Sequence, residues 1–162
     1  AGQQPDDLIP DDTTELDNIA IVGALQFTGT EEIDAITGGS LTNATGTQLA
    51  NYSNAGDGMT MVAPTDSQSI DANGGQRSFG GTSCASPNLA GVAALVWSEN
   101  TCLTGVDVLD LLTHSAMDLG DVGRDNTFGH GLVNAEAAVR RSHALAENKE
   151  LASFYSNDEF LA

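Results

Sequence analysis

Positive charge is scarce in this sequence. Its 162 residues hold five lysines and arginines against 23 aspartates and glutamates, which gives a formal net charge of −18, and Lys149 is the single lysine. Nucleic acids and anionic membrane surfaces are bound through clustered lysine and arginine side chains, so neither is expected as a partner. High acidity suits surroundings in which salt or calcium screens carboxylates. The composition therefore favours a secreted or extracellular location, and a high-salt environment fits it as well.

Cysteine is also scarce, with two residues, and apolar runs of membrane length are missing, as are histidines before residue 114. Cys84 and Cys102 are expected to be free thiols, because a mostly helical stretch between them would separate them by roughly 20 Å, whereas a disulfide needs its Cα atoms within about 7 Å. No apolar run reaches the roughly 20 residues that cross a bilayer. The first histidine is His114. The start at Ala1, without a methionine or signal peptide, is interpreted as a cut from a longer chain.

Two apolar segments predict strands. The run over residues 19–27, IAIVGALQF, is typical of a strand buried on both faces, as in a parallel sheet covered by helices. Residues 59–64 form a second candidate that ends at Pro64, because proline cannot donate to a strand ladder. Residues 28–57 are expected to form loops with one short strand near QLANYS, and a loop is expected to continue from Pro64 to Gly81.

Three helices are predicted in the second half. The first runs from Ser83 to about Ser98, and its apolar residues cover almost the whole circumference, which predicts a central, buried helix. The second begins with a capping signature at Thr104 and Asp107, and the third is capped by Asn134. The apolar residues of the first helix are Ala85, Leu89, Val92, Ala93, Leu95 and Val96.

A threonine and a serine directly precede the first of these helices, in the stretch GTSCASPNLAG that runs from Gly81 to Gly91. A serine hydroxyl becomes a useful nucleophile when a base and a site for the resulting oxyanion lie beside it. A helix N-terminus offers unpaired N–H groups and the positive end of the helix dipole. The local pattern alone favours a simpler interpretation, in which Thr82 or Ser83 is an ordinary helix N-cap.

The full string GTSCASPNLAG resembles the serine signature of the subtilisin-like serine proteases, the subtilases. YSNAGDGMTMVAP and TFGHGLVNAEAAV resemble the segments that flank this signature in the family, and NIAIVGA resembles the strand that follows its oxyanion asparagine. The resemblance implies an α/β fold, a subtilisin-like doubly wound parallel sheet with helices on both faces, of which only the C-terminal half is present. Residues 1–148 would form that half, and residues 149–162 a tail or linker.

The resemblance also implies a function and a set of site residues. The chain would supply the nucleophile, Ser83, of a serine endopeptidase that acts on protein or peptide substrates and requires no cofactor for catalysis. Gln3 stands where the family has its oxyanion asparagine, and Ala1, Gly2 and Thr82 would contact substrate. The family's aspartate and histidine precede its serine, so they would lie in a missing N-terminal half of the same domain, which is the expected partner.

The three histidines and the altered oxyanion position leave an alternative open. His114, His130 and His143 are expected to be packing or surface residues and not the base for Ser83. Gln3 keeps the amide of asparagine but is one methylene longer. The alternative is therefore a catalytically inactive subtilase-like module that acts as a binding or structural domain.

Structural calcium is the one metal that the resemblance suggests, since subtilases are commonly stabilised by it. An acidic N-terminal stretch offers carboxylate ligands, although a solvated acidic loop is the favoured interpretation, and the same holds for Asp121 and Asp125. No metal ligands are assigned from the sequence. The carboxylates of the N-terminal stretch are Asp6, Asp7, Asp11, Asp12, Glu15 and Asp17.

Overall fold

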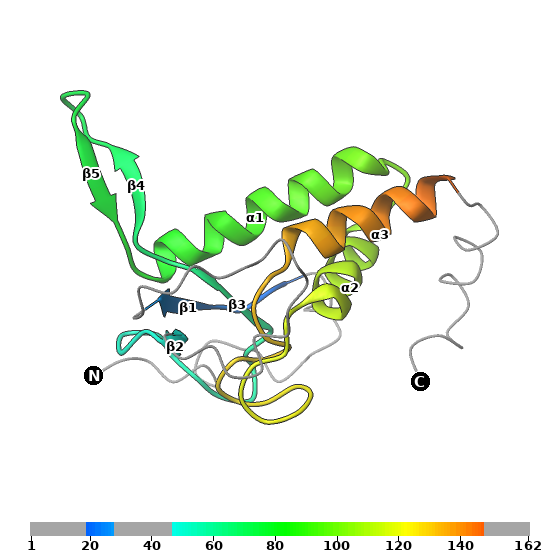
Figure 1. Ribbon diagram of the computed structural model, residues 1–162, viewed down its shortest axis with the longest axis horizontal. Coiled ribbons are helices and arrows are strands. Elements are labelled where there is room, and N and C mark those ends of the chain that lie inside the picture. The colour runs from blue at the N-terminus through cyan, green and yellow to red at the C-terminus, as the bar shows by residue number, and fades with distance from the viewer. Residues whose placement is uncertain (1–18, 28–46, 148–162) are drawn as a thin grey trace.

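A small sheet of three strands lies at the centre of the computed structural model, which describes residues 19–27 and 47–147 (Figure 1). Strand β1 (Val22–Phe27) pairs in parallel with β3 (Met61–Pro64), with Ala24 opposite Ala63. On its other side β1 pairs antiparallel with the short strand β2 (Thr47–Leu49). The two strands predicted from apolar runs are confirmed, with β1 starting three residues later than expected, and the short strand near QLANYS is β2.

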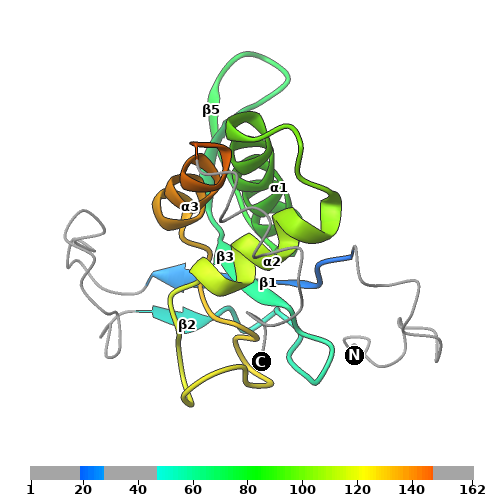
Figure 2. The same cartoon turned by 90° about the vertical axis from the view of Figure 1, so that its right-hand side faces the viewer.

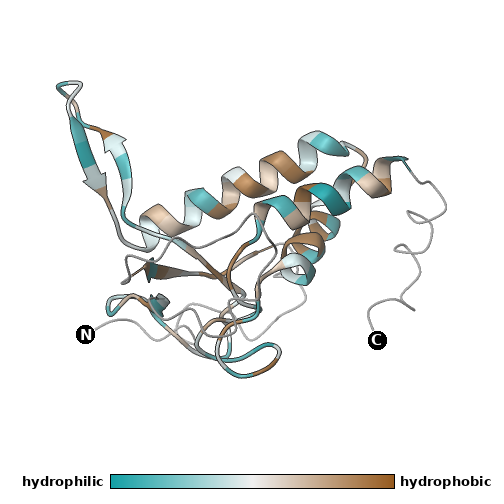
Figure 3. Ribbon diagram, in the orientation of Figure 1, coloured by the Kyte–Doolittle hydropathy of each residue, from teal (hydrophilic) through white to brown (hydrophobic). Residues whose placement is uncertain are grey.

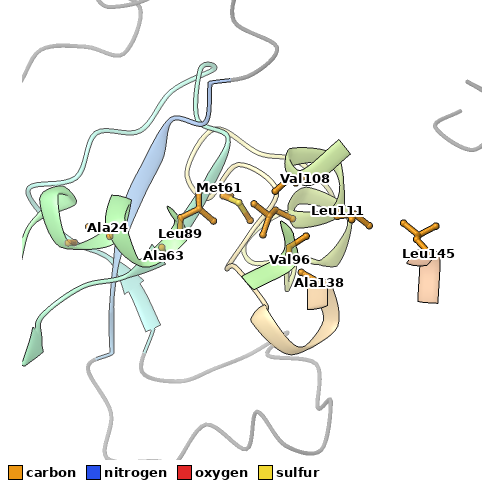
Figure 4. Packing of buried hydrophobic residues seen from close by; sticks show 12 residues of the cluster. Ala24, Met61, Ala63, Leu89, Val96, Val108, Leu111, Ala138 and Leu145 are labelled. Carbon is orange, nitrogen blue, oxygen red and sulfur yellow. The ribbon is translucent and has the colours of Figure 1, made fainter. Parts of the chain in front are cut away.

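Alternate residues of β1 and β3 are buried on opposite faces of this sheet. Ala24, Met61 and Ala63 belong to one hydrophobic cluster, whereas Leu25 and Val62 belong to another. All five side chains have at most 1% of their surface exposed, as the prediction of a strand buried on both faces requires. The larger cluster is completed from the helices by Ala85, Leu89, Val96, Val108, Leu111, Leu112, Ala138 and Leu145, and from the turn after β2 by Ala50 (Figure 4).

Three helices pack on the first of these faces. They are α1 (Thr82–Glu99), α2 (Gly105–Ser115) and α3 (Ala135–Glu147), and Figure 2 shows them on the same side of the sheet. The other face is covered by the irregular segment 116–134, which contributes Leu119 and Leu132 to the second cluster. The α/β fold class is confirmed, and within residues 19–27 and 47–147 the helices lie on one face only.

The predicted caps of α2 and α3 are confirmed. The Thr104 hydroxyl accepts the Asp107 N–H at 3.2 Å, and the Asp107 carboxylate accepts the Thr104 N–H at 2.7 Å, which forms a complete capping box for α2. The Asn134 side chain accepts the Ala137 N–H at 3.0 Å at the start of α3. These caps satisfy N–H groups that the first helical turn leaves without acceptors.

The prediction of a loop between Pro64 and Gly81 is wrong. Strands β4 (Ser67–Ile70) and β5 (Gln76–Phe79) form an antiparallel hairpin there, which projects from the body of the fold (Figure 1). The Asp71 carboxylate accepts the N–H groups of Asn73 and Gly75 at 2.7 and 3.0 Å and closes the turn. The hairpin's residues are mostly polar and exposed, so no apolar alternation marks these strands in the sequence.

Helix α1 is less buried than its composition predicts. Cys84, Ala85, Leu89 and Val96 are buried, but Leu95 is 54% exposed. Trp97 on the same helix is 48% exposed, and Figure 3 shows hydrophobic residues spread along the helix. The expectation of a helix buried all round is wrong for the described chain, because α2, α3 and the sheet cover one side of α1 only.

Both cysteines are free, as predicted: Cys84 is buried and Cys102 is exposed. None of the three helices is long and apolar enough to cross a membrane.

Candidate active site

Ser83 is the second residue of α1 and its side chain is exposed. The helix starts beside the carboxyl end of β1 (Figure 1), the edge of a sheet at which α/β proteins bind ligands. Gly81 is the N-cap residue, with φ 88° and ψ 172°, and no side chain caps the helix. The interpretation of Thr82 or Ser83 as the N-cap is therefore wrong, and the Ser83 hydroxyl does not cap the helix.

The first backbone N–H groups of α1 point away from the helix without partners in it. The Gly81 carbonyl accepts the first helical bonds, from the N–H groups of Cys84 at 2.9 Å and Ala85 at 3.3 Å. The N–H groups of Thr82 and Ser83 precede these bonds, and no described residue accepts from them. No acidic side chain lies in the first turn to offset the positive end of the helix dipole. This geometry suits the stabilisation of negative charge that develops next to Ser83.

Two hydroxyl groups hold the turn before Ser83. The Tyr52 hydroxyl accepts the Gly81 N–H at 3.3 Å, and the Thr65 hydroxyl donates to the Gly81 carbonyl at 3.1 Å. The two hydroxyl oxygens are 3.2 Å apart and hydrogen-bonded to each other. Thr65 directly follows β3 and is 8% exposed, and its N–H donates to the Leu25 carbonyl at 3.1 Å. Through these bonds, both the N–H and the carbonyl group of Gly81 are connected to the sheet.

One turn further along α1, Asn88 fixes the helix to the end of β3. Its side-chain amide donates to the Pro64 carbonyl at 2.9 Å and to the Ser67 hydroxyl at 3.3 Å. The same amide lies 3.7 Å from the Cys84 sulfur. The start of α1 is therefore attached to the carboxyl end of β3 at two points, by Thr65 at the Gly81 carbonyl and by Asn88 at the Pro64 carbonyl.

Cys84, next to Ser83, points the other way, into the protein. Its side chain is 2% exposed and packs under the start of the helix. Burial raises the pKa of the Cys84 thiol, but hydrogen bonds, first of all with the side chain and backbone of Ser67, lower it by more, so the pKa lies below its usual value. Cys84 is therefore a small buried residue, with polar contacts that the sequence does not reveal.

The histidines lie away from Ser83. The His130 N–H donates to the Thr60 carbonyl at 2.8 Å, next to the beginning of β3, whereas Ser83 lies at the end of that strand. Burial lowers the pKa of His130, and the positive charges of Arg124 and His114 lower it further. No hydrogen bond joins a histidine to Ser83 in the described part of the chain. That none of them is the base for Ser83 stays a prediction, which this placement supports.

The other two histidines contact helix residues. The His114 Nδ1 lies 2.8 Å from the Asp110 carbonyl oxygen on α2. The His143 Nδ1 lies 3.1 Å from the Glu99 carboxylate, which connects α3 to the end of α1. Both therefore have structural partners in the helical layer.

The carboxylates of the segment 116–134 do not assemble a metal site. Asp125 accepts the N–H groups of Thr127 and Phe128 with one oxygen, at 2.7 Å each, and the N–H of Asp121 with the other at 3.2 Å. Across residues 19–27 and 47–147, no group of three or more His, Cys, Asp or Glu side chains is arranged to hold a metal ion. Asp125 instead stabilises its own turn.

Several predicted site residues lie outside the described residues. They are Ala1, Gly2 and Gln3 and the six carboxylates of the N-terminal acidic stretch, so their roles stay predictions. Thr82 is exposed beside Ser83. Sequence reasoning missed Tyr52 and Thr65, because nothing in the local pattern connects them to a helix that begins 30 and 17 residues later. Asn88 was missed as well.

Comparisons with known proteins found a matching family model and several relatives. The model of the subtilase family, peptidase S8, matches residues 7–131. Alkaline elastase YaB from Bacillus sp. (strain YaB) is 45% identical over 92 residues, 56% of this chain and 24% of the relative. Subtilisin BL from Lederbergia lenta is 41% identical over 92 residues, 56% of this chain and 33% of the relative. The chain thus spans a quarter to a third of the length of these relatives.

A solved structure resembles the fold over a larger share of the chain. The A-subunit of the AB5 toxin from E. coli matches 83% of this chain and 41% of its own length with a TM-score of 0.63 and 20% sequence identity. This likeness concerns the fold alone.

Proposed function

Because this chain belongs to the subtilase family of serine proteases, we propose that it carries the nucleophile of a serine endopeptidase, Ser83. The observation that carries the proposal is the position of Ser83: it is exposed at the start of α1, at the carboxyl end of the sheet, with its hydroxyl not used as a helix cap. The substrates would be proteins or peptides, and the reaction would be hydrolysis of a peptide bond.

The reaction follows from what each group can do. Once a base removes its proton, the Ser83 oxygen attacks the carbonyl carbon of the scissile bond, and the carbonyl oxygen becomes an oxyanion. The Ser83 N–H would donate to that oxyanion, and the Gln3 amide would be the second donor. A protonated base then gives its proton to the leaving amine, and water hydrolyses the acyl-enzyme. The base and the aspartate that orients it would come from polypeptide outside this sequence.

The proposed partner is therefore the N-terminal half of the same catalytic domain. Apolar surface on the helices supports it. Leu95 and Trp97 are about half exposed on α1, and an apolar groove runs between α1, α2 and the beginning of β1. Exposed apolar surface of this kind is typical of an interface. Polypeptide that covers Leu95, Trp97 and this groove would complete the burial that the composition of α1 predicts.

A second candidate function is a catalytically inactive module of the same fold that binds or supports other proteins. Gln3 favours it, because its amide is displaced by one methylene from the position expected for an asparagine. The polypeptide encoded before Ala1 discriminates between the two functions. Segments resembling Asp-Thr-Gly and His-Gly-Thr there would support the peptidase, whereas their absence would support the inactive module.

The proposal extends to the environment and the metal content of the protein. The net charge of −18 supports secretion and tolerance of high salt. Catalysis by a serine, a base and an oxyanion site needs no cofactor. Structural calcium is proposed without assigned ligands, since no group of three or more His, Cys, Asp or Glu side chains in residues 19–27 and 47–147 is arranged to hold a metal ion.

Proteolysis of an unfolded substrate tests the proposal. We expect the full-length protein to cleave a reduced and carboxymethylated protein at internal peptide bonds, and we expect prior treatment with a fluorophosphonate to stop the cleavage. The treated sample is the control, because its protein and salt content are the same. A folded full-length protein that leaves the substrate intact would exclude the peptidase and leave the inactive module.

A further inference from the structure

We propose that Tyr52 and Thr65 are positioning residues: their hydroxyl groups close a hydrogen-bonded ring around Gly81 that sets the position of Ser83. This inference rests on the proposed function, since it assigns the pair to the same nucleophile. The members of the ring come from three elements: Tyr52 from the turn after β2, Thr65 from the end of β3, and Gly81 from the start of α1.

The direction of every hydrogen bond in the ring is fixed by counting protons. A hydroxyl group carries one proton to donate. Thr65 donates its proton to the Gly81 carbonyl, so the bond between the hydroxyl groups must use the proton of Tyr52. The Tyr52 oxygen in turn accepts from the Gly81 N–H. The ring therefore runs from the Gly81 N–H through Tyr52 and Thr65 back to the Gly81 carbonyl, and each bond polarises the next.

Gly81 is a position at which such a ring matters for Ser83. Its φ of 88° lies in the left-handed region, and its carbonyl also accepts the first helical N–H bonds from Cys84 and Ala85. The ring thus fixes the residue that aligns the first turn of α1. A shift of this turn would move both the Ser83 oxygen and its N–H relative to a bound carbonyl, and displacements of about 1 Å cost on the order of 100-fold in rate.

The remaining contacts should keep α1 attached when the ring is opened. Asn88 holds the helix to the Pro64 carbonyl through a bond that does not involve either hydroxyl. Removal of one ring hydroxyl should therefore loosen the turn at Gly81 without detaching the helix. This separation makes the proposal testable in a folded protein.

The variants are Tyr52→Phe and Thr65→Val in the full-length protein, singly and together. Each single change is expected to lower kcat about tenfold with KM within about twofold, because positioning of the attacking oxygen is lost while the binding surface stays. The double variant should also lose about tenfold, not a hundredfold, because either change alone opens the ring. Thr65→Ser keeps the hydroxyl and should restore kcat.

Ser98→Ala is the matched control. The Ser98 hydroxyl donates to the Leu95 carbonyl at 2.7 Å near the other end of α1, so this variant also removes a bond from a hydroxyl to a backbone carbonyl. We expect it to leave kcat unchanged. An equal loss in Ser98→Ala would show that general weakening of α1 explains the ring variants, and the proposal would be wrong.

Hydrogen exchange at the Gly81 N–H provides a readout independent of catalysis. It should become faster in Tyr52→Phe and stay unchanged in Ser98→Ala. Unchanged exchange, or faster exchange with wild-type kcat, contradicts the proposal. Failure of the proposed function would appear separately, as hydrolysis that survives Ser83→Ala in the otherwise unaltered protein. In that case, the rate of hydrogen exchange at the Gly81 N–H would still decide whether the ring holds the turn.

Discussion

Ser83→Ala in the full-length protein is expected to lower kcat/KM for peptide hydrolysis by at least about 10⁴-fold. The loss is this large because the serine, its base and the orienting carboxylate act as one unit, and without the oxygen nucleophile only binding and oxyanion stabilisation remain. The free energy of unfolding should hardly change, since the Ser83 side chain is exposed and does not cap α1. Initial rates on a chromogenic peptide, with denaturant unfolding of the same samples, measure both effects.

Ser86→Ala is the control for this variant. Ser86 is an exposed serine three residues further along α1, so the change removes the same atoms from the same helix. Its kcat/KM should stay within about twofold of the wild type, because loss of one hydroxyl from the groove between α1 and α2 removes no reacting atom. Substantial hydrolysis by the Ser83 variant would mean that another residue is the nucleophile, and the assignment of the site would be wrong.

Gly131→Ala is expected to destabilise the protein by about 3–5 kcal/mol, more than almost any surface substitution. Gly131 has a φ of 103°, and a Cβ atom there would overlap the carbonyl oxygen of Met117. The clash is with backbone that is itself fixed, because Met117 and Leu132 exchange two hydrogen bonds of 2.8 Å. The Gly131 carbonyl also accepts the Val62 N–H at 3.0 Å and so connects this segment to β3.

Gly123→Ala separates the clash from the backbone conformation. Gly123 has a φ of 85°, but a Cβ atom there has no heavy atom within 4 Å. Only the left-handed backbone is strained, which costs roughly 1–2 kcal/mol. Chemical denaturation of the two full-length variants should show the larger loss for Gly131. Equal losses would mean that close packing under β3 is not the reason for glycine at 131.

Much of the fold could be predicted because the signals are local. The apolar runs of β1 and β3 are long and dense, and the capping box at Thr104 and Asp107 is a pattern of two residues three positions apart. The hairpin of β4 and β5 was missed because its strands are polar and exposed, and its turn depends on the Asp71 carboxylate. Burial of α1 was overestimated because composition predicts an apolar surface and not the elements that cover it.

The candidate site was predicted only where the sequence carries a motif. Ser83 stands in an eleven-residue signature, so its position at a helix start could be expected. Tyr52 and Thr65 could not, because their contacts with Gly81 depend on the parallel pairing of β1 and β3 and on the turn after β2. Contacts between residues this far apart in sequence arise from the tertiary fold, and no local spacing encodes them.

Labelling with a fluorophosphonate tests the central claim most directly, because such a probe marks a serine that a base has activated. The full-length protein is treated with the probe, its intact mass is measured, and the modified peptide is sequenced. We predict one adduct per molecule on Ser83 and none in Ser83→Ala. An unmodified Ser83 in a folded full-length protein, or an adduct on another residue, would contradict the account of this serine as the nucleophile.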